Sequence, residues 1–285
     1  MAVACADASD APASSDAPED ADAPEDADAA AEPSEHDTDR TLHVLPDQVV
    51  EPDTLDDAAE ILRARFEGVG GIDLTVDDTA EVIEVRLPDE VADSPATATS
   101  LEQPGRLEIR PVVEEITPQQ GEDDQPACDG FLEEDAIAPP PPDEQHRACE
   151  HPRFLGAMSQ DEADEPSRFE LGPAVLNHDH ITGLDVTEAG DSHQLAIDVS
   201  AEGAERIQEL TAELACERDQ GQLAMLGFVV DGAVISAAGI APTVECGVGI
   251  DGDGLSLAAF DEAEAMELQR LLAHGPLPVA FRVER

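Results

Sequence analysis

Apolar residues first recur regularly near position 42, where a strand pattern is followed by a helix pattern. Leu42, Val44 and Leu45 begin the predicted strand. The helix is indicated by apolar residues three or four positions apart, which form one buried stripe. Asp53 or Thr54 can cap it, and a cluster of glycines from 68 to 71 ends it. The residues of the stripe are Leu55, Ala58, Ala59, Leu62 and Phe66.

Two alternating runs then predict a hairpin over residues 72–87, with a polar Asp77-Asp78 turn between its strands. A second helix fits residues 89–104, although Pro95 and several Ser and Thr residues interrupt its pattern. A last strand is supplied by Leu107, Ile109 and Val112. Residues 41–118 therefore show the order β-α-β-β-α-β, which is a ferredoxin-like pattern.

A second mixed unit is predicted over residues 168–275. Alternating apolar residues form a strand up to Val199, and residues 200–211 form a capped helix. A strand then leads through an Asp231-Gly232 turn into a second strand that ends at Ser236. A glycine-rich segment, an amphipathic helix and a Gly-Pro-Leu-Pro corner follow. Val279, Phe281 and Val283 alternate as a final strand, which we expect to complete the first unit over residues 276–285.

The remaining segments show no such periodicity. Residues 1–40 consist almost wholly of Ala, Asp, Glu, Pro and Ser, so we expect a disordered acidic tether that cannot bury enough apolar surface to fold. Residues 119–167 form a proline-rich loop with Cys128 and Cys149 at either side of its prolines. The fold class predicted is thus α+β, with a ferredoxin-like base, an inserted α+β head and a disordered N-terminus.

Charge excludes several functions. The chain has 67 acidic residues against 14 basic ones, all of them Arg, and a net charge of -53. Nucleic-acid binding and a basic membrane patch both need clustered cations, so neither is expected. No window has the about 18–20 consecutive apolar residues of a membrane span. The acidity suits a salty environment, or it reflects a general bias toward Ala, Asp and Glu.

The five cysteines indicate an oxidising, extracytoplasmic compartment. Cys5 follows small apolar residues as in the end of a lipoprotein signal peptide, so it is a candidate for lipidation if a longer precursor exists. The other four allow three pairings, and proximity along the chain favours Cys128–Cys149 and Cys216–Cys246. No C-x-x-C spacing occurs, so zinc and thioredoxin-type chemistry are not expected.

No catalytic or metal constellation stands out. Ser236 lacks the G-x-S-x-G context of a nucleophile. The Asp251–Asp253 segment lacks the distal Glu of a calcium loop, and His178 with His180 has no visible third ligand. We therefore expect no enzyme activity, no cofactor and no metal.

Several motifs together resemble the first large extracytoplasmic domain of the SecD/SecDF protein-export family, in its actinobacterial form. They are ILRARFEGVGG (Ile61–Gly71), IEVRLP (Ile83–Pro88), GRLEIRPV (Gly105–Val112) and the run from Leu223 to Arg285. The positions that match the family's motifs are Arg65, Gly70, Leu87, Pro88, Arg110, Gly172, Pro173, Gly203, Thr211, Asp231, Gly232, Ser236, Gly252, Ala265, Gly275, Leu277 and Pro278.

The resemblance implies a non-enzymatic domain that assists Sec-dependent export by transient contact with preprotein or translocon subunits. It implies a place at the outer face of the cytoplasmic membrane, with Cys5 as the only expected membrane attachment. Two departures stand out: Ala237-Ala238-Gly239 replaces the family's proline, and the sequence ends at Arg285, where the family continues into transmembrane helices. The alternative is a lipid-anchored lipoprotein that uses the fold for ligand binding or scaffolding.

Overall fold

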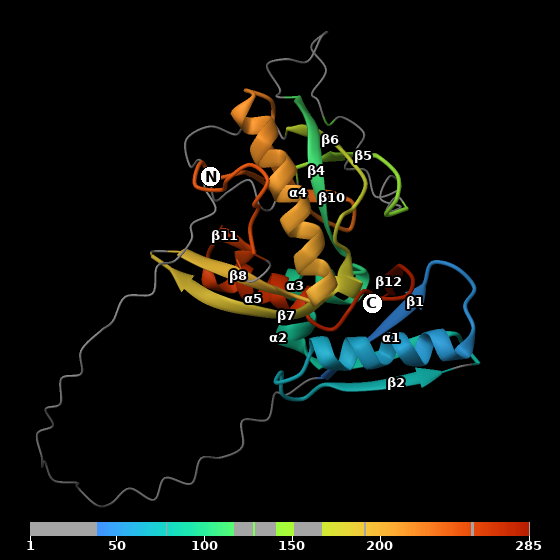
Figure 1. Cartoon of the computed structure of the whole chain (residues 1–285). Coiled ribbons are helices and arrows are strands. Elements are labelled where there is room, and N and C mark those ends of the chain that lie inside the picture. Colours follow the sequence, from blue (N-terminus) through green and yellow to red (C-terminus); the bar gives the residue numbers. More distant parts are fainter. Residues whose placement is uncertain are drawn as a thin grey trace, which may run out of the picture.

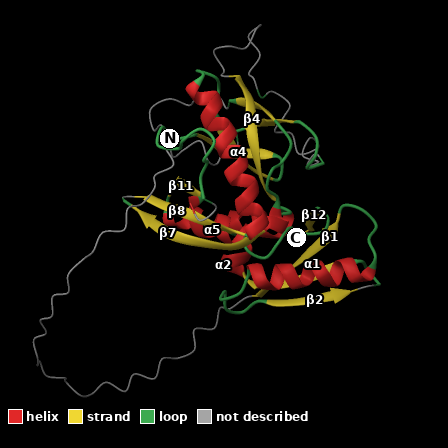
Figure 2. Ribbon diagram, in the orientation of Figure 1, coloured by secondary structure: helices red, strands yellow, loops and turns green. Residues whose placement is uncertain are grey.

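The computed structural model describes residues 39–77, 79–116, 128, 141–150, 167–190, 192–251 and 254–284. Figure 1 shows that they form two parts, a base around α1 and a head around α4. Figure 2 shows helices and strands mixed in both parts, which confirms the predicted α+β class. The expected tether falls outside the described residues except for its last two, and so does most of the loop over residues 119–167.

The base is one antiparallel sheet covered by helices. Its strand order is β12-β1-β3-β2. Buried residues of the α1 stripe, including Leu55 and Leu62, pack with Leu42, Val44 and Ile83 of the sheet. Pro52 begins α1, where its missing N–H costs nothing. The elements are β1 (Asp39–Pro46), α1 (Pro52–Arg65), β2 (Asp73–Asp77), β3 (Val82–Pro88), α2 (Asp89–Ala92), α3 (Pro95–Glu102) and β12 (Phe281–Glu284).

The expected last strand of the base lies elsewhere. Leu107, Ile109 and Val112 belong to β4 (Leu107–Ile116), which is a central strand of the head, and β12 takes the fourth place in the base. The physical reason is burial. Residues 107–110 are buried on both faces of β4, as a central strand requires, whereas β12 buries one face and exposes the other, as an edge strand does.

β4 belongs to a five-stranded sheet with the order β10-β9-β4-β6-β5. The two edges of the sheet meet, since Glu150 just after β5 forms a parallel bridge with Val234 of β10 at the opposite edge. The sheet is therefore curled. A small core fills the curl, with Phe169, Leu171 and Val229 among its residues. The further strands are β5 (His146–Cys149), β6 (Arg168–Leu171), β9 (Met225–Val230) and β10 (Ala233–Gly239).

The rest of the head is a three-stranded sheet, β11-β8-β7, packed against two helices. Ser200 caps the longer helix by accepting from the Gly203 N–H, and the helix continues to Asp219, well beyond the predicted 211. Asp261 and Glu264 form a capping box on the shorter helix. The elements are η4 (His178–His180), β7 (Ile181–Ala189), β8 (Ser192–Val199), α4 (Ala201–Asp219), β11 (Ser256–Phe260) and α5 (Glu262–Leu272).

The chain passes between base and head twice. It leaves the base after α3 through residues 103–106, the first crossing, and returns after α5 through residues 273–280, the second crossing. The head is therefore inserted into the ferredoxin-like base, as predicted. Within the described part of the chain, no helix is long and apolar enough to span a membrane.

Candidate functional site

Arg65, the last residue of α1, ties both crossings to the base. Its side chain is 1% exposed. Nη1 donates to the carbonyl oxygens of Ser100 (2.9 Å) and Gln103 (2.8 Å), and Nη2 donates to those of Pro104 (2.5 Å) and Gly275 (3.3 Å). Burial lowers the pKa of Arg65 to about 10, so the guanidinium remains charged at neutral pH. One side chain thus holds both the segment by which the chain enters the head and the segment by which it leaves.

Asp231 holds the first crossing from the head side. Its carboxylate accepts from the N–H groups of Gly105 (3.0 Å) and Arg106 (2.8 Å), while its own N–H donates to the Arg106 carbonyl (3.0 Å). Burial raises the pKa of Asp231, and the two N–H donors oppose that shift. Asp231 and Gly232 have φ values of 50° and 86°, which fit the predicted tight turn. The turn is buried in the contact rather than exposed at a hairpin tip.

Gly105 is the closest point of this contact. A Cβ there would lie 2.5 Å from the Leu271 carbonyl oxygen and 2.6 Å from Arg65 Nη2, and its φ of +77° also favours glycine. The residues Arg65, Gly105, Arg106, Asp231 and Gly275 are called the head–base junction below. No titratable pair in it is arranged for acid–base chemistry; its hydrogen bonds position backbone.

Two histidines border the junction. His146 on β5 donates from Nε2 to the Gly232 carbonyl (2.9 Å), and burial, followed by the Arg110 charge, lowers the pKa of this imidazole. His178 on η4 faces Gly275, whose added Cβ would lie 3.4 Å from the histidine Nε2. Burial also lowers the pKa of His178; the charge of Asp179 raises it and that of Arg65 lowers it.

A second arginine organises the five-stranded sheet. Arg110 is buried and pairs with Glu108 through Nε (2.8 Å). Nη1 donates to the carbonyls of Glu144 (2.8 Å) and Gly172 (3.0 Å), and Nη2 to that of Pro141 (3.5 Å). Gly172 has no room for a side chain, since a Cβ would lie 2.8 Å from Pro111 Cγ. This cluster ties β4 to the segment just after β6 and to the segment just before β5, and it supports the groove described below.

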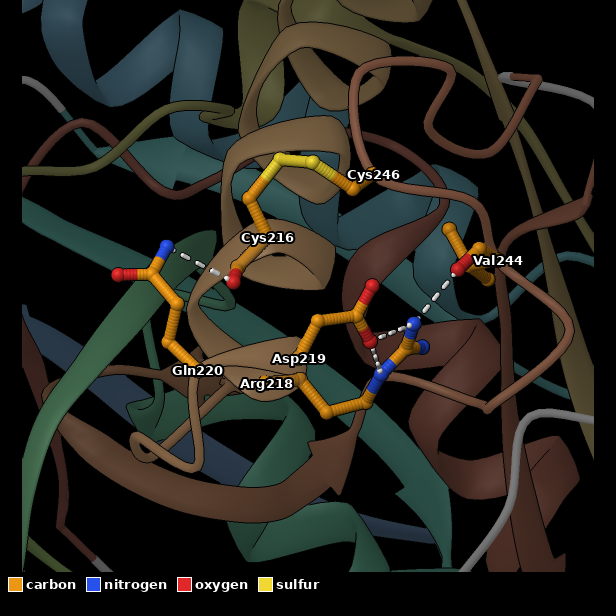
Figure 3. Close-up of a disulfide and its surroundings, with 6 residues drawn as sticks. All are labelled: Cys216, Arg218, Asp219, Gln220, Val244 and Cys246. Atoms are coloured by element: carbon orange, nitrogen blue, oxygen red, sulfur yellow. Dashed lines mark hydrogen bonds and ion pairs between the residues drawn. A yellow bond between two sulfur atoms is a disulfide. The ribbon is translucent and has the colours of Figure 1, made fainter.

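Other motif positions hold α4 and the segment after β10 together. Thr211 donates to the Ile207 carbonyl (2.7 Å) and accepts from the Ile250 N–H (2.8 Å). Figure 3 shows the Cys216–Cys246 disulfide above Arg218, which donates to the Val244 carbonyl (2.8 Å) and pairs with Asp219. Gly203 is buried against His180, and Ala265 is fully buried in the head core.

The remaining predicted positions have structural surroundings. Leu87 is buried in the base, and Pro88 precedes α2. Leu277 donates its N–H to the Pro104 carbonyl (2.8 Å), next to the exposed Pro278. Gly70 is exposed with open space around it, and Ser236 is half-buried in β10. A disulfide joins Cys128 to Cys149 at the end of β5. Gly252 and Cys5 lie outside the described residues.

A groove of about 470 Å³ opens between α4 and the strands around β4. Apolar side chains dominate its lining, and two of them are well exposed, Val113 at 57% and Leu223 at 39%. Glu213 and Glu217, one turn apart on α4, also line it. The groove-lining residues used below are Val113, Pro173, Leu210, Glu213, Glu217 and Leu223.

Sequence reasoning missed the parts of the junction that depend on distant contacts. Gly105 was recognised only as the start of a motif, and the histidines at 146 and 178 were assigned no place at the junction. The sequence prediction of a strand through Leu107, Ile109 and Val112 did not include the charged residues between them, Glu108 and Arg110, which are buried as a pair. Among the described residues, no group of three or more His, Cys, Asp or Glu could hold a metal ion.

Comparisons with known proteins agree with this geometry. Residues 157–279 match the family model described as SecDF, P1 head subdomain. The fold is similar to the structure titled "Crystal structure of SecDF in Super-membrane-facing form", with TM-score 0.55 and 20% identity, over 87% of this chain and 30% of that one. It is also similar to "Structure and function of a membrane component SecDF that enhances protein export", with TM-score 0.54 and 19% identity, over 86% and 98%.

The chain thus spans about 30% of the length of the first of these two structures. The comparison with curated proteins found no match. The segment that matches the family model includes the elements of the head from β6 to α5. Residues 157–279 are therefore similar to the SecDF P1 head subdomain, and the described chain has a fold similar to that of the two SecDF structures.

Proposed function

We propose that this chain assists protein export, without a chemical step of its own, by transient contact between its head and an unfolded segment of a passing preprotein. One of the two similar structures is titled as a membrane component that enhances protein export. The observation that carries the proposal is the groove between α4 and β4. Exposed apolar side chains in a concave site are typical of surfaces that bind another polypeptide.

The lining of the groove suits a segment that is apolar and carries few acidic residues. Val113 and Leu223 offer exposed apolar contacts, and Pro173 adds a third. Glu213 and Glu217 repel acidic segments and attract basic ones, although salt weakens this effect at the surface. Such contacts are weak and sequence-tolerant, as expected for a protein that must release many different chains.

The supports of the groove keep its walls in place. Arg110 holds the Gly172 carbonyl on one side, and Thr211 with the Cys216–Cys246 disulfide holds α4 on the other. The two disulfides also favour an oxidising, extracytoplasmic location, where they persist. We therefore place the contact on the outer side of the membrane.

Binding of a fluorescent, unfolded secretory polypeptide tests this function in solution. We expect Leu223→Ser and Val113→Ser each to weaken binding about fivefold, because apolar contacts at such sites contribute on the order of 1 kcal/mol. Met266→Ser on α5 and Val49→Ser in the base are matched controls, since both residues are exposed and apolar but lie outside the groove. Unchanged binding by both groove variants, or equal loss in the controls, would exclude the groove as the contact.

A further inference from the structure

His178 lies where the head meets the second crossing. It belongs to η4, directly before β7, and its ring faces Gly275. Its Nδ1 atom is buried and is among the polar atoms of the described residues that have no hydrogen-bond partner. A buried nitrogen without a partner is unfavourable, and it becomes more unfavourable when it carries a proton and a charge.

The charges around His178 come from two elements. Arg65 approaches from α1, and Asp179 is the next residue of η4. The Gly275 carbonyl beside the ring already accepts from Arg65 Nη2 (3.3 Å). A protonated His178 would therefore be a second cation beside a buried guanidinium, and among the described residues the counter-charge that acts on it is Asp179, which is exposed.

We propose that His178 makes the head–base junction acid-sensitive, so that protonation of its imidazole favours a state in which the head is released from Arg65 and the two crossings. In the closed junction the neutral ring packs against Gly275. In the released state water hydrates the ring, and the pKa of the imidazole returns to the ordinary value for histidine, about 6.5. This inference does not depend on the proposed function, because it concerns only the contact between head and base.

Proton linkage gives the direction in which pH shifts the equilibrium between the closed and released states. Burial lowers the pKa of His178 in the closed junction. The contribution of His178 to the stability of the closed state is therefore fully present above pH 6.5 and is lost as pH falls toward the lowered pKa. At pH 5.5, one unit below the ordinary value, release is favoured by up to about tenfold. The effect grows between pH 7.5 and pH 5.5, which is the window to examine.

Two other groups titrate near the junction. His146 faces Arg110 and Glu108, and burial lowers its pKa, so it acts in the same direction as His178. Burial raises the pKa of Asp231, which faces Arg65 and Arg106, so its protonation acts in the opposite direction. The variant His146→Gln removes the contribution of His146 and leaves that of His178 in place.

A packing role alone would not give this pH dependence. Phenylalanine fills a similar ring-shaped space against Gly275 but cannot be protonated. His178→Phe is therefore the decisive variant. His193→Gln, which changes a half-buried histidine of β8, is the matched control for loss of a histidine in the head.

Hydrogen exchange of the full chain at pH 7.5 and 5.5, expressed as protection factors, measures release directly. The reporters are the N–H groups of Gly105, Arg106 and Leu277, which bond across the junction. The N–H of Ile207 inside α4 reports on unfolding of the head itself.

In the unaltered chain and in His193→Gln, we expect protection of the three reporters to fall up to about tenfold at pH 5.5, while Ile207 stays protected. In the His146→Gln background, which removes the other group that acts in the same direction, His178→Phe should show no loss of reporter protection at pH 5.5. Equal loss in His178→Phe and the unaltered chain would overturn the proposal, and so would equal loss at Ile207. If His178→Phe does not fold, His178→Asn serves the same test.

Discussion

At the scale of single residues, the close contact at Gly105 makes the sharpest prediction for stability. Gly105 and Gly221 have the same φ of +77°, but a Cβ at Gly105 would meet the Leu271 carbonyl and Arg65, whereas nothing lies within 4 Å at Gly221. Gly221→Ala therefore introduces backbone strain alone, about 1 kcal/mol. Gly105→Ala adds steric conflict and should lower the free energy of unfolding by about 2–4 kcal/mol. Chemical denaturation of the two variants checks this difference, and equal losses would contradict it.

Arg65 should contribute more to stability than any surface arginine of the head. Arg65→Met removes the guanidinium donor from the carbonyls of residues 100, 103, 104 and 275, of which Pro104 keeps the Leu277 N–H, and this should cost about 3–5 kcal/mol. Arg206→Met removes only an exposed pair with Glu202 and should change stability by about 0.5 kcal/mol or less. Urea unfolding of both variants tests this. A small loss for Arg65→Met would mean that water replaces the guanidinium.

At the scale of elements, local patterns predicted most helices and strands, because each depends on nearby residues. The stripe of α1, the strand pair of β2 and β3, and the Asp231-Gly232 turn all follow from spacing and turn residues. The partner of β4 could not be predicted in this way. Its alternation fits an edge strand, and only the burial of the Arg110–Glu108 pair and the strands on both sides show that it is central.

The disulfide between α4 and the segment after β10 should stabilise the head. It closes a loop with a sequence separation of 30, so chain entropy predicts a loss of about 3.6 kcal/mol in the free energy of unfolding when both Cys216 and Cys246 are changed to Ser. Thermal and denaturant unfolding measure the loss. A change below about 1 kcal/mol would show that the Thr211 and Arg218 hydrogen bonds hold this segment without the covalent tie.

At the scale of the whole molecule, the charge of -53 dominates behaviour in solution. Repulsion among so many carboxylates opposes the compact state, and salt screens it over about 10 Å at 0.1 M and about 3 Å at 1 M. We therefore expect the unfolding midpoint to rise steadily as NaCl increases from low concentration toward 1 M. A midpoint that does not change with salt would mean that the acidic surface has no effect on stability and favours a compositional bias as its origin.

The candidate site could be predicted from the sequence only in part, because it is formed by residues that are far apart in the chain. The motif positions Arg65, Asp231 and Gly275 stand out individually, but their meeting requires contacts between residues as far as 210 positions apart. The groove likewise combines α4 with β4, and these two elements are separated in the sequence by the strands from β5 to β8. Hydrophobic periodicity identifies the faces of helices and strands, whereas the meeting of distant segments depends on the packing of the whole chain.

The most direct test of the central claim, that the groove of the head contacts exported polypeptides, is site-specific photocrosslinking in cells that are actively exporting a secretory protein. A photoreactive residue replaces Leu223 in the groove or, as the control, Val49 in the base, since both positions are exposed. We predict crosslinks to the preprotein from position 223 that disappear when export stops, and few from position 49. Equal crosslinking from both positions, or none from position 223 while the folded protein is abundant, would contradict the claim.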